Sequence, residues 1–221
     1  MSASENAHLR GRRFVTRSFD VLCALVLGAF LLPLTLIVLL LLLIRSPGNP
    51  FYLQKRMGRG GKTIRVVKFR TMKRGASLSA AQEAEYRLEY KLDDDPRLIG
   101  YRKMGDGKRC FGALLRRTSL DELPQLYWNV LLCGNMSLVG PRPILAEELQ
   151  AYYTDDEQKM LLSVKPGVTG YWQAYARGHA LYADGERQRM ELYYVTHRSL
   201  RLDLKILFRT VLTVISKAGA K

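Results

Sequence analysis

The sequence has few of the residues that hold metals or disulfides. Its three cysteines, Cys23, Cys110 and Cys133, and its three histidines do not stand at the spacings of zinc ligands. An odd number of cysteines, one of them inside an apolar segment, argues against a disulfide framework and indicates a reducing compartment. We interpret each histidine as an ordinary surface or core residue. A zinc-binding domain and a disulfide-stabilised secreted fold are therefore not expected.

Acidic residues are scarce in the N-terminal third of the chain. The 221 residues carry a formal net charge of +15, and residues 1–75 contain 14 Lys/Arg against 2 Asp/Glu. Such an excess suits nucleic acid, anionic lipid or phosphorylated substrates. Aromatic residues are not interleaved with this basic region, as stacking on nucleic acid bases would require, so nucleic acid is not an expected partner.

Charge is absent altogether from Val21 to Ile44, about 24 residues, and a membrane-spanning helix needs about 20. The length of this run and the lack of a small-residue cleavage motif argue against a signal peptide. Basic residues flank both ends, and because cytoplasmic loops favour positive charge, both flanks prefer the same side of a membrane. Pro33 would bend a helix near its middle. These residues leave a re-entrant helix and a kinked spanning helix both open.

After a turn cluster at Ser46–Pro50, the rest of the chain has the length of one globular domain. Two β-favouring runs, Phe51–Met57 and Thr63–Met72, flank a glycine-rich turn and predict a hairpin. Helical patterns follow in four segments: Ser77–Leu92, Leu123–Leu132, Ala146–Val164 and Glu186–Ser216. The last of these favours helices lying on a bilayer or, equally, core helices, and Pro166–Gln173 is interpreted as a glycine-rich loop.

The segment from Ser119 to Leu126 contains two adjacent carboxylates, Asp121 and Glu122, next to arginines. Ser119 and Glu122 have the spacing of a capping box, so both acids could serve only to start a helix. Pro124 suits only the opening of a helix and therefore places the helix start near Asp121. A helix start also offers free N–H groups to a phosphate and keeps a carboxylate ionised. An active site and a plain helix cap both fit the residues.

Several cations have placements that suit an anionic ligand. Lys68 and Arg70 share one face of a predicted strand, although a solvated strand face is the alternative. Arg142 stands between two prolines, which restrain its backbone and lower the entropic cost of binding an anion, or simply form a rigid turn. Arg97 follows three aspartates at 93–95, which we interpret as a solvated acidic turn.

These motifs occur together and in order. They are Asp20, the apolar run with Pro33, Ser46–Gly48, Lys68–Met72, Asp95–Arg97, Ser119–Leu126, Asn135–Pro143 and Pro166–Gly170. In this combination the chain resembles the bacterial sugar transferases, that is, the monotopic polyprenyl-phosphate phosphoglycosyl transferases, over nearly all residues after Arg17. Two positions depart from that family: Leu32 replaces a serine before Pro33, and Ala176-Arg177-Gly178 stands where many members have Gly-Arg-Asn.

The resemblance implies transfer of a phosphosugar from a UDP-sugar to undecaprenyl phosphate with release of UMP, the first membrane step of a bacterial surface glycan such as an exopolysaccharide, capsule, O-antigen or glycoprotein. Asp121 matches the family's nucleophile, and Glu122, with Asp121, matches the site of Mg²⁺, for which Mn²⁺ is an alternative. Five cations are the candidates that offset the substrate charge: Lys68, Arg70, Arg97, Arg117 and Arg142. Of these, Arg142 matches the motif that meets the nucleotide.

The implied architecture is a membrane-associated α+β fold. It comprises a basic N-terminal tail at 1–17, a re-entrant membrane helix at 18–45 and a cytosolic, mainly helical catalytic domain at 46–221 with a small β-hairpin and interfacial amphipathic helices. The expected location is the cytoplasmic face of a bacterial inner membrane, with UDP-sugar, undecaprenyl phosphate and anionic lipid as partners and a homodimer left open. The rival hypotheses are a membrane-tethered basic binding protein without catalysis and a direct glycosyl transferase that releases UDP.

Overall fold

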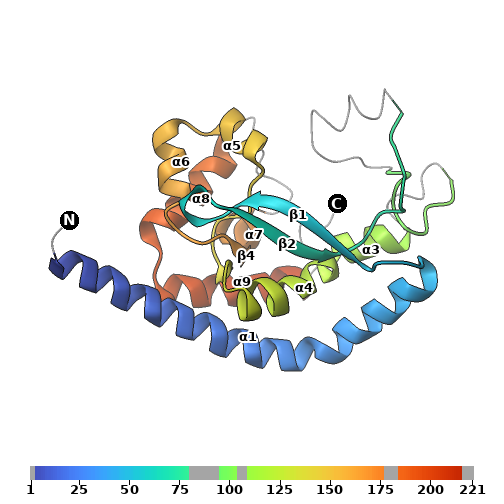
Figure 1. The fold of residues 1–221 in the computed structure, drawn as a ribbon, viewed down its shortest axis with the longest axis horizontal. Coiled ribbons are helices and arrows are strands. Elements are labelled where there is room, and N and C mark those ends of the chain that lie inside the picture. The colour runs from blue at the N-terminus through green and yellow to red at the C-terminus, as the bar shows by residue number, and fades with distance from the viewer. Residues whose placement is uncertain (1–2, 80–94, 104–108, 177–183, 216–221) are drawn as a thin grey trace. The chain divides into compact units, whose positions relative to one another are not determined.

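The computed structural model describes residues 3–79, 95–103, 109–176 and 184–215 (Figure 1). The chain divides into two compact units, and the division falls within the first helix. The first unit contains Met1–Leu32, Leu53–Val67 and Pro124–Lys221, and the second contains Pro33–Tyr52 and Lys68–Leu123. Each unit has an apolar core of its own.

Helix α1 extends over Ala3–Arg45, so it begins well before the predicted start at residue 18. Residues 3–17 are rich in helix-forming Ala, Glu, Leu and Arg, with Gly11 as the main exception, and they continue the helix instead of forming a separate tail. The part from Phe14 to Arg45 is long and apolar enough to cross a membrane. Many of its apolar side chains are exposed, as at Phe30, which suits contact with lipid.

Buried polar contacts fix the N-terminal half of α1 within the first unit. Asp20 accepts hydrogen bonds from the Ser137 hydroxyl at 2.6 Å and from the Leu138 N–H at 2.9 Å. Arg17 donates to the carbonyl oxygens of Val130 and Leu131. Asp20 is therefore held by neutral donors, because a buried carboxylate needs its acceptor positions satisfied.

Strands β1 (Phe51–Met57) and β2 (Thr63–Phe69) pair in a two-stranded sheet, which confirms the predicted hairpin. The short 3₁₀ turn η1 (Arg59–Gly61) connects them, and the Gly58 N–H donates to the Lys62 carbonyl at 2.8 Å. Gly60 has a φ of 71°, a left-handed conformation that glycine adopts without steric cost. Strand β2 ends at Phe69, before the predicted end at Met72.

A second, parallel sheet joins β3 (Ser137–Val139) to β4 (Gly167–Thr169), with Ser137 opposite Gly167 and Val139 opposite Thr169. The prediction of a loop over Pro166–Gln173 was therefore wrong. A three-residue strand is too short for an alternation of polar and apolar residues to be recognised in the sequence. The pairing of β3 with β4 depends instead on the close approach of the two backbones. A Cβ on Gly167 would lie 2.1 Å from the Gly140 nitrogen.

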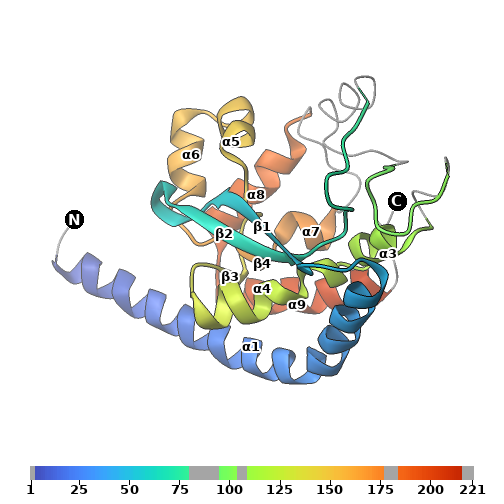
Figure 2. The ribbon, with the colours of Figure 1, turned by 45° about the vertical axis from the view of Figure 1, so that its right-hand side comes forward.

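Helices surround this short sheet in the first unit. After β4 follow α7 (Tyr171–Tyr175), α8 (Glu186–His197) and α9 (Leu200–Ile215), and Figure 2 shows α9 beside β3 and β4. Leu126, Val130, Met136, Leu138 and Ile206 are among the buried side chains of this core. Helix α9 buries Asp203 and Ile206 in this unit and exposes the apolar side chains of Leu204 and Phe208. The expected C-terminal helices are confirmed.

Two of the predicted helices have a different form in the structure. The expected single helix over Ala146–Val164 is two helices, α5 (Ala146–Tyr152) and α6 (Asp155–Leu161). The break is fixed by the Glu157 carboxylate, which accepts hydrogen bonds from the Thr154 N–H at 2.9 Å and from its hydroxyl at 3.0 Å.

The segment Leu123–Leu132 is helical but is not a uniform α-helix. It comprises a short α-helix, α4 (Leu123–Gln125), and a π-helix, η4 (Leu126–Leu132), a form that is often found near functional sites. Asn129 of η4 is buried, and its side chain accepts the Val67 N–H and donates to the Arg65 carbonyl. The predicted helix Ser77–Leu92 lies mostly outside the described residues.

The second unit contains helix α3 (Phe111–Arg117), which leads into the segment with the two carboxylates. Its Gly112 approaches the backbone of two other segments so closely that an added Cβ would lie 2.4 Å from the Thr71 carbonyl oxygen. Hydrogen bonds connect the Ile99 N–H to the Thr71 carbonyl and the Gly112 N–H to the Ile99 carbonyl, both at 2.9 Å. These contacts hold the start of α3 and the segments around residues 71 and 99 in one arrangement.

Candidate active site

The two adjacent carboxylates lie in the first turn of a helical segment. The 3₁₀ turn η3 (Leu120–Glu122) leads directly into α4, so the predicted helix start near Asp121 is confirmed. Ser119 does not cap this start with its side chain, and the capping-box interpretation was wrong. Its carbonyl accepts the Glu122 N–H at 3.0 Å, and its φ of 58° is unusual for a residue other than glycine. Strain of this kind occurs often at functional sites.

Asp121 is only 8% exposed, and this burial controls its ionisation. Burial, followed by the neighbouring Glu122 carboxylate, raises the pKa of Asp121 to about 7, although the charges of Lys68 and Arg116 oppose the shift. The expectation that the helix start keeps this carboxylate ionised was therefore wrong, because burial outweighs the helix. Added positive charge would favour the ionised form, so Asp121 responds to what binds beside it.

Lys68 reaches the carboxylate pair from strand β2. Its ammonium lies 2.6 Å from Glu122 Oε1, and both side chains are partly exposed, at 25% and 29%. This is a hydrogen-bonded ion pair at a surface that solvent and ligands can reach. The structure therefore places Lys68 beside the carboxylate pair, and its predicted role of offsetting substrate charge stays a prediction.

A second group of charges is organised by Asp95, which is 2% exposed. Arg97 donates to both carboxylate oxygens at 2.8 Å, from Nε and from Nη2. Burial raises the pKa of Asp95, but the hydrogen bonds from Arg97 outweigh it, and the pKa lies below its usual value. Arg116 lies 3.9 Å away and donates to the Thr71 hydroxyl at 2.9 Å. Asp95 is thus a buried anchor, not part of a solvated turn.

Two predicted cations have other surroundings. Arg117 is exposed at the end of α3, whereas its neighbour Arg116 is the residue whose charge acts on Asp121. Arg70 follows the end of β2 and donates to the carbonyl oxygens of Ser46 and Pro47. The strand alternation that predicted a shared face for Lys68 and Arg70 ends at Phe69, so the two side chains have separate partners.

Arg142 belongs to the first unit, where two buried carboxylates hold its loop. Its backbone N–H donates to Glu191 at 3.1 Å, and its guanidinium lies 3.9 Å from Glu148. Glu148 also pairs with Arg56 at 3.3 Å. Burial raises the pKa of Glu191 to about 7, opposed mainly by Arg187. Sequence reasoning missed both carboxylates, because nothing local distinguishes a buried glutamate on a helix from an exposed one.

The donor set near Asp121 suits a hard divalent cation. Over the described residues, no cluster of three or more His, Cys, Asp or Glu side chains could hold a metal by itself. Mg²⁺ is usually held by one or two carboxylates, with substrate phosphates and water as its other ligands. Asp121 and Glu122 provide two such carboxylates, so they fit an ion that is shared with a phosphorylated substrate.

Comparison with known proteins identifies the family. The profile of the family described as "Bacterial sugar transferase" matches residues 11–217. The chain is 39% identical over 213 residues to the exopolysaccharide production protein ExoY of Sinorhizobium fredii, with 92% of this chain and 87% of that protein covered. It is 37% identical over 223 residues to the undecaprenyl-phosphate galactose phosphotransferase of Salmonella typhimurium, covering 97% of this chain and 43% of that protein.

A further relative is the UDP-galactose-lipid carrier transferase of Erwinia amylovora, which is 36% identical over 228 residues and covers all of this chain. The chain spans less than half the length of the Erwinia and Salmonella relatives. With a family profile matched over nearly its whole length, this chain belongs to the bacterial sugar transferase family and is a transferase.

Proposed function

We propose that this chain transfers a phosphosugar from a UDP-sugar to undecaprenyl phosphate, with Asp121 as the covalent nucleophile. The observation that carries the proposal is the surroundings of Asp121: a buried carboxylate at a helix start, next to Glu122 and under the charges of Lys68 and Arg116. The names of the relatives supply the substrate class, because they include transferases that act on undecaprenyl phosphate.

The reaction proceeds in two displacements at one phosphorus atom. A carboxylate oxygen of Asp121 attacks the β-phosphorus of the UDP-sugar, the bond from that phosphorus to the bridging oxygen breaks, and UMP leaves with the electron pair. The sugar phosphate is then bound to Asp121 as a mixed anhydride. A phosphate oxygen of undecaprenyl phosphate attacks the same phosphorus, forms the diphosphate and returns the carboxylate.

The described side chains have separate roles in these steps. Asp121 and Glu122 would hold Mg²⁺, or Mn²⁺, and the ion would neutralise diphosphate charge and favour the ionised form of Asp121. Lys68 is held beside Glu122 and can shift its hydrogen bond to a phosphate oxygen. Arg97 and Arg116, which Asp95 and Thr71 orient, add fixed positive charge. Arg142 is proposed to meet the nucleotide, and roles for Arg70 and Arg117 remain predictions.

The proposed location is the cytoplasmic face of a bacterial inner membrane. Support comes from the exposed apolar side chains of α1 and from the basic residues that flank its uncharged run. We propose that α1 is re-entrant and that α9 lies at the interface, with Leu204 and Phe208 toward lipid. Anionic lipid would be attracted by the basic flanks.

Replacing the nucleophile tests the proposal. With undecaprenyl phosphate, Mg²⁺ and a panel of UDP-sugars, the wild type is expected to release UMP with at least one sugar. Asp121→Asn is expected to reduce UMP release at least about a thousandfold and to abolish labelling of the protein by a radiolabelled UDP-sugar, because an amide is not a nucleophile. Asp156→Asn, which changes a carboxylate that is 93% exposed on α6, is the matched control and should keep full activity.

Three results would contradict the proposal. Full activity of the Asp121→Asn variant would remove the nucleophile assignment. Release of UDP in place of UMP would indicate direct glycosyl transfer. Failure of every UDP-sugar to react, with a folded protein, would favour the alternative of a membrane-tethered binding protein without catalysis.

A further inference from the structure

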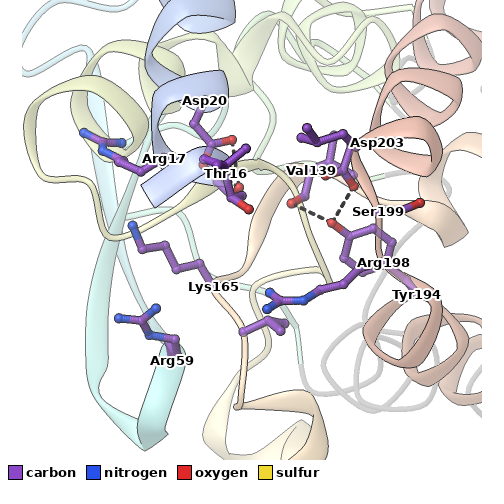
Figure 3. Close-up of a pocket in the computed structure, with 14 residues that line it drawn as sticks. Thr16, Arg17, Asp20, Arg59, Val139, Lys165, Tyr194, Arg198, Ser199 and Asp203 are labelled. Atoms are coloured by element: carbon purple, nitrogen blue, oxygen red, sulfur yellow. Dashed lines mark hydrogen bonds between the residues drawn. The ribbon is translucent and has the colours of Figure 1, made fainter. Parts of the chain in front are cut away.

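The first unit contains a cavity of about 600 Å³ that none of the candidate active-site residues lines. Its volume is in the range of small-ligand sites, which is about 300–1,000 Å³. Figure 3 shows Arg17, Lys165 and Arg59 along one side of the cavity, with Arg198 reaching in from the other side. Among the described residues that line the same cavity, two are carboxylates, Asp20 and Asp203, so these walls carry an excess of positive charge.

Both carboxylates accept hydrogen bonds from neutral donors of the first unit. Asp20 is 2% exposed and accepts hydrogen bonds from the Ser137 hydroxyl and the Leu138 N–H. Asp203 is 7% exposed, and its Oδ1 accepts from the Tyr194 hydroxyl at 2.8 Å. Each carboxylate therefore has a structural role of its own within the first unit.

Lys165 lies half-buried in the wall of this cavity, just before β4. Burial lowers its pKa, as do the charges of Arg17 and Arg59, whereas the charge of Asp20 raises it. Among the described residues, no hydrogen bond or ion pair involves the Lys165 ammonium. Arg17 cannot move away, because its guanidinium is bound to the carbonyl oxygens of Val130 and Leu131. The charge of Asp20 offsets part of the repulsion between these cations, and a bound anion would offset more of it.

We propose that this cavity binds the phosphate group of an anionic ligand, with Lys165 and Arg59 as its principal donors. Lysine and arginine are the side chains that recognise phosphate, as a point charge and as a planar fork respectively. The apolar wall residues Val139 and Val164 leave room for the uncharged part of such a ligand.

The position of the cavity indicates an anionic phospholipid headgroup as one source of this phosphate. Val15 and Arg17, which line it, lie on α1 close to the start of the uncharged run. Leu200, which also lines it, is the first residue of α9, a helix that exposes Leu204 and Phe208. Two helices with exposed apolar side chains therefore border the cavity, as expected for a site at a bilayer surface. A soluble phosphate is the other source.

The test measures binding by the full chain in neutral detergent micelles, so it needs no turnover. The melting temperature, Tm, is followed during titration with phosphatidylglycerol, with phosphatidylcholine and, separately, with inorganic phosphate, because a ligand of the folded state raises Tm. Lys165→Gln is expected to weaken binding of the anionic ligand about tenfold, the effect of losing one charge-assisted hydrogen bond. Arg59→Gln, at an exposed position, is expected to act in the same direction and covers the case that Lys165→Gln folds poorly.

Lys205→Gln is the matched control, since it removes an exposed charge on α9 outside the cavity. Its affinity should stay within about twofold of the wild type, because surface charges contribute little singly. A Lys165-dependent response to phosphatidylglycerol alone assigns the lipid headgroup, and one to inorganic phosphate assigns a soluble phosphate. Equal losses in Lys205→Gln and Lys165→Gln, equal responses to both lipids, or no response to any ligand would overturn the proposal.

Discussion

The buried carboxylate of Glu191 makes the stability of the first unit depend on pH. Glu191 is 3% exposed, and its pKa rises from 4.5 to about 7 in the folded protein. A carboxyl with a raised folded pKa binds its proton more tightly in the folded state than in the unfolded state. Its stabilising contribution is therefore complete below about pH 4.5 and is lost as the pH rises to about 7.

The size of this effect follows from the shift. One pKa unit corresponds to about 1.4 kcal/mol, so a shift of this size changes the free energy of unfolding by about 3 kcal/mol. Glu191→Gln removes the ionisable proton but keeps an oxygen that can accept the Arg142 N–H. The variant should lack this part of the pH dependence. For a chain of this length, the difference corresponds to about 6–12 °C in Tm.

The assay compares Tm of the wild type and Glu191→Gln in the same detergent from pH 4.5 to pH 8. The gap between the two curves should widen in favour of the variant as the pH rises and should then level off above about pH 7. Glu186→Gln changes an exposed carboxylate on the same helix and should give a curve parallel to that of the wild type. Parallel curves for Glu191→Gln as well would refute the reasoning.

Two further predictions concern the second unit. Asp95→Asn should lower the free energy of unfolding by about 3–5 kcal/mol, because it leaves the Arg97 guanidinium without its buried anion. The variant should also reduce UMP release. Unchanged thermal unfolding of the variant would show that Asp95 is not the anchor. Removal of divalent cations with EDTA should abolish UMP release and Mg²⁺ should restore it, whereas full activity in EDTA would contradict the assignment of Asp121 and Glu122 as ligands.

The sequence by itself determined the features that rest on local chemistry. An uncharged run long enough for a membrane and a hairpin around glycine follow from neighbouring residues alone. The helix start at Asp121 follows likewise, because Pro124 allows few other positions. The order of the motifs was enough to indicate the family, which the comparisons then showed.

Only the tertiary structure decided which charges are buried and which partners they have. The sequence did not distinguish Asp95 from a solvated aspartate, and it did not distinguish Arg116 from Arg117. Burial and ion pairing depend on residues that are distant in the chain. The pairing of β3 with β4 joins segments about thirty residues apart through glycines that local patterns do not distinguish from loop residues. The near-neutral pKa of Asp121 could not be predicted from the sequence either. It depends on the desolvation of the carboxylate, which is set by tertiary packing.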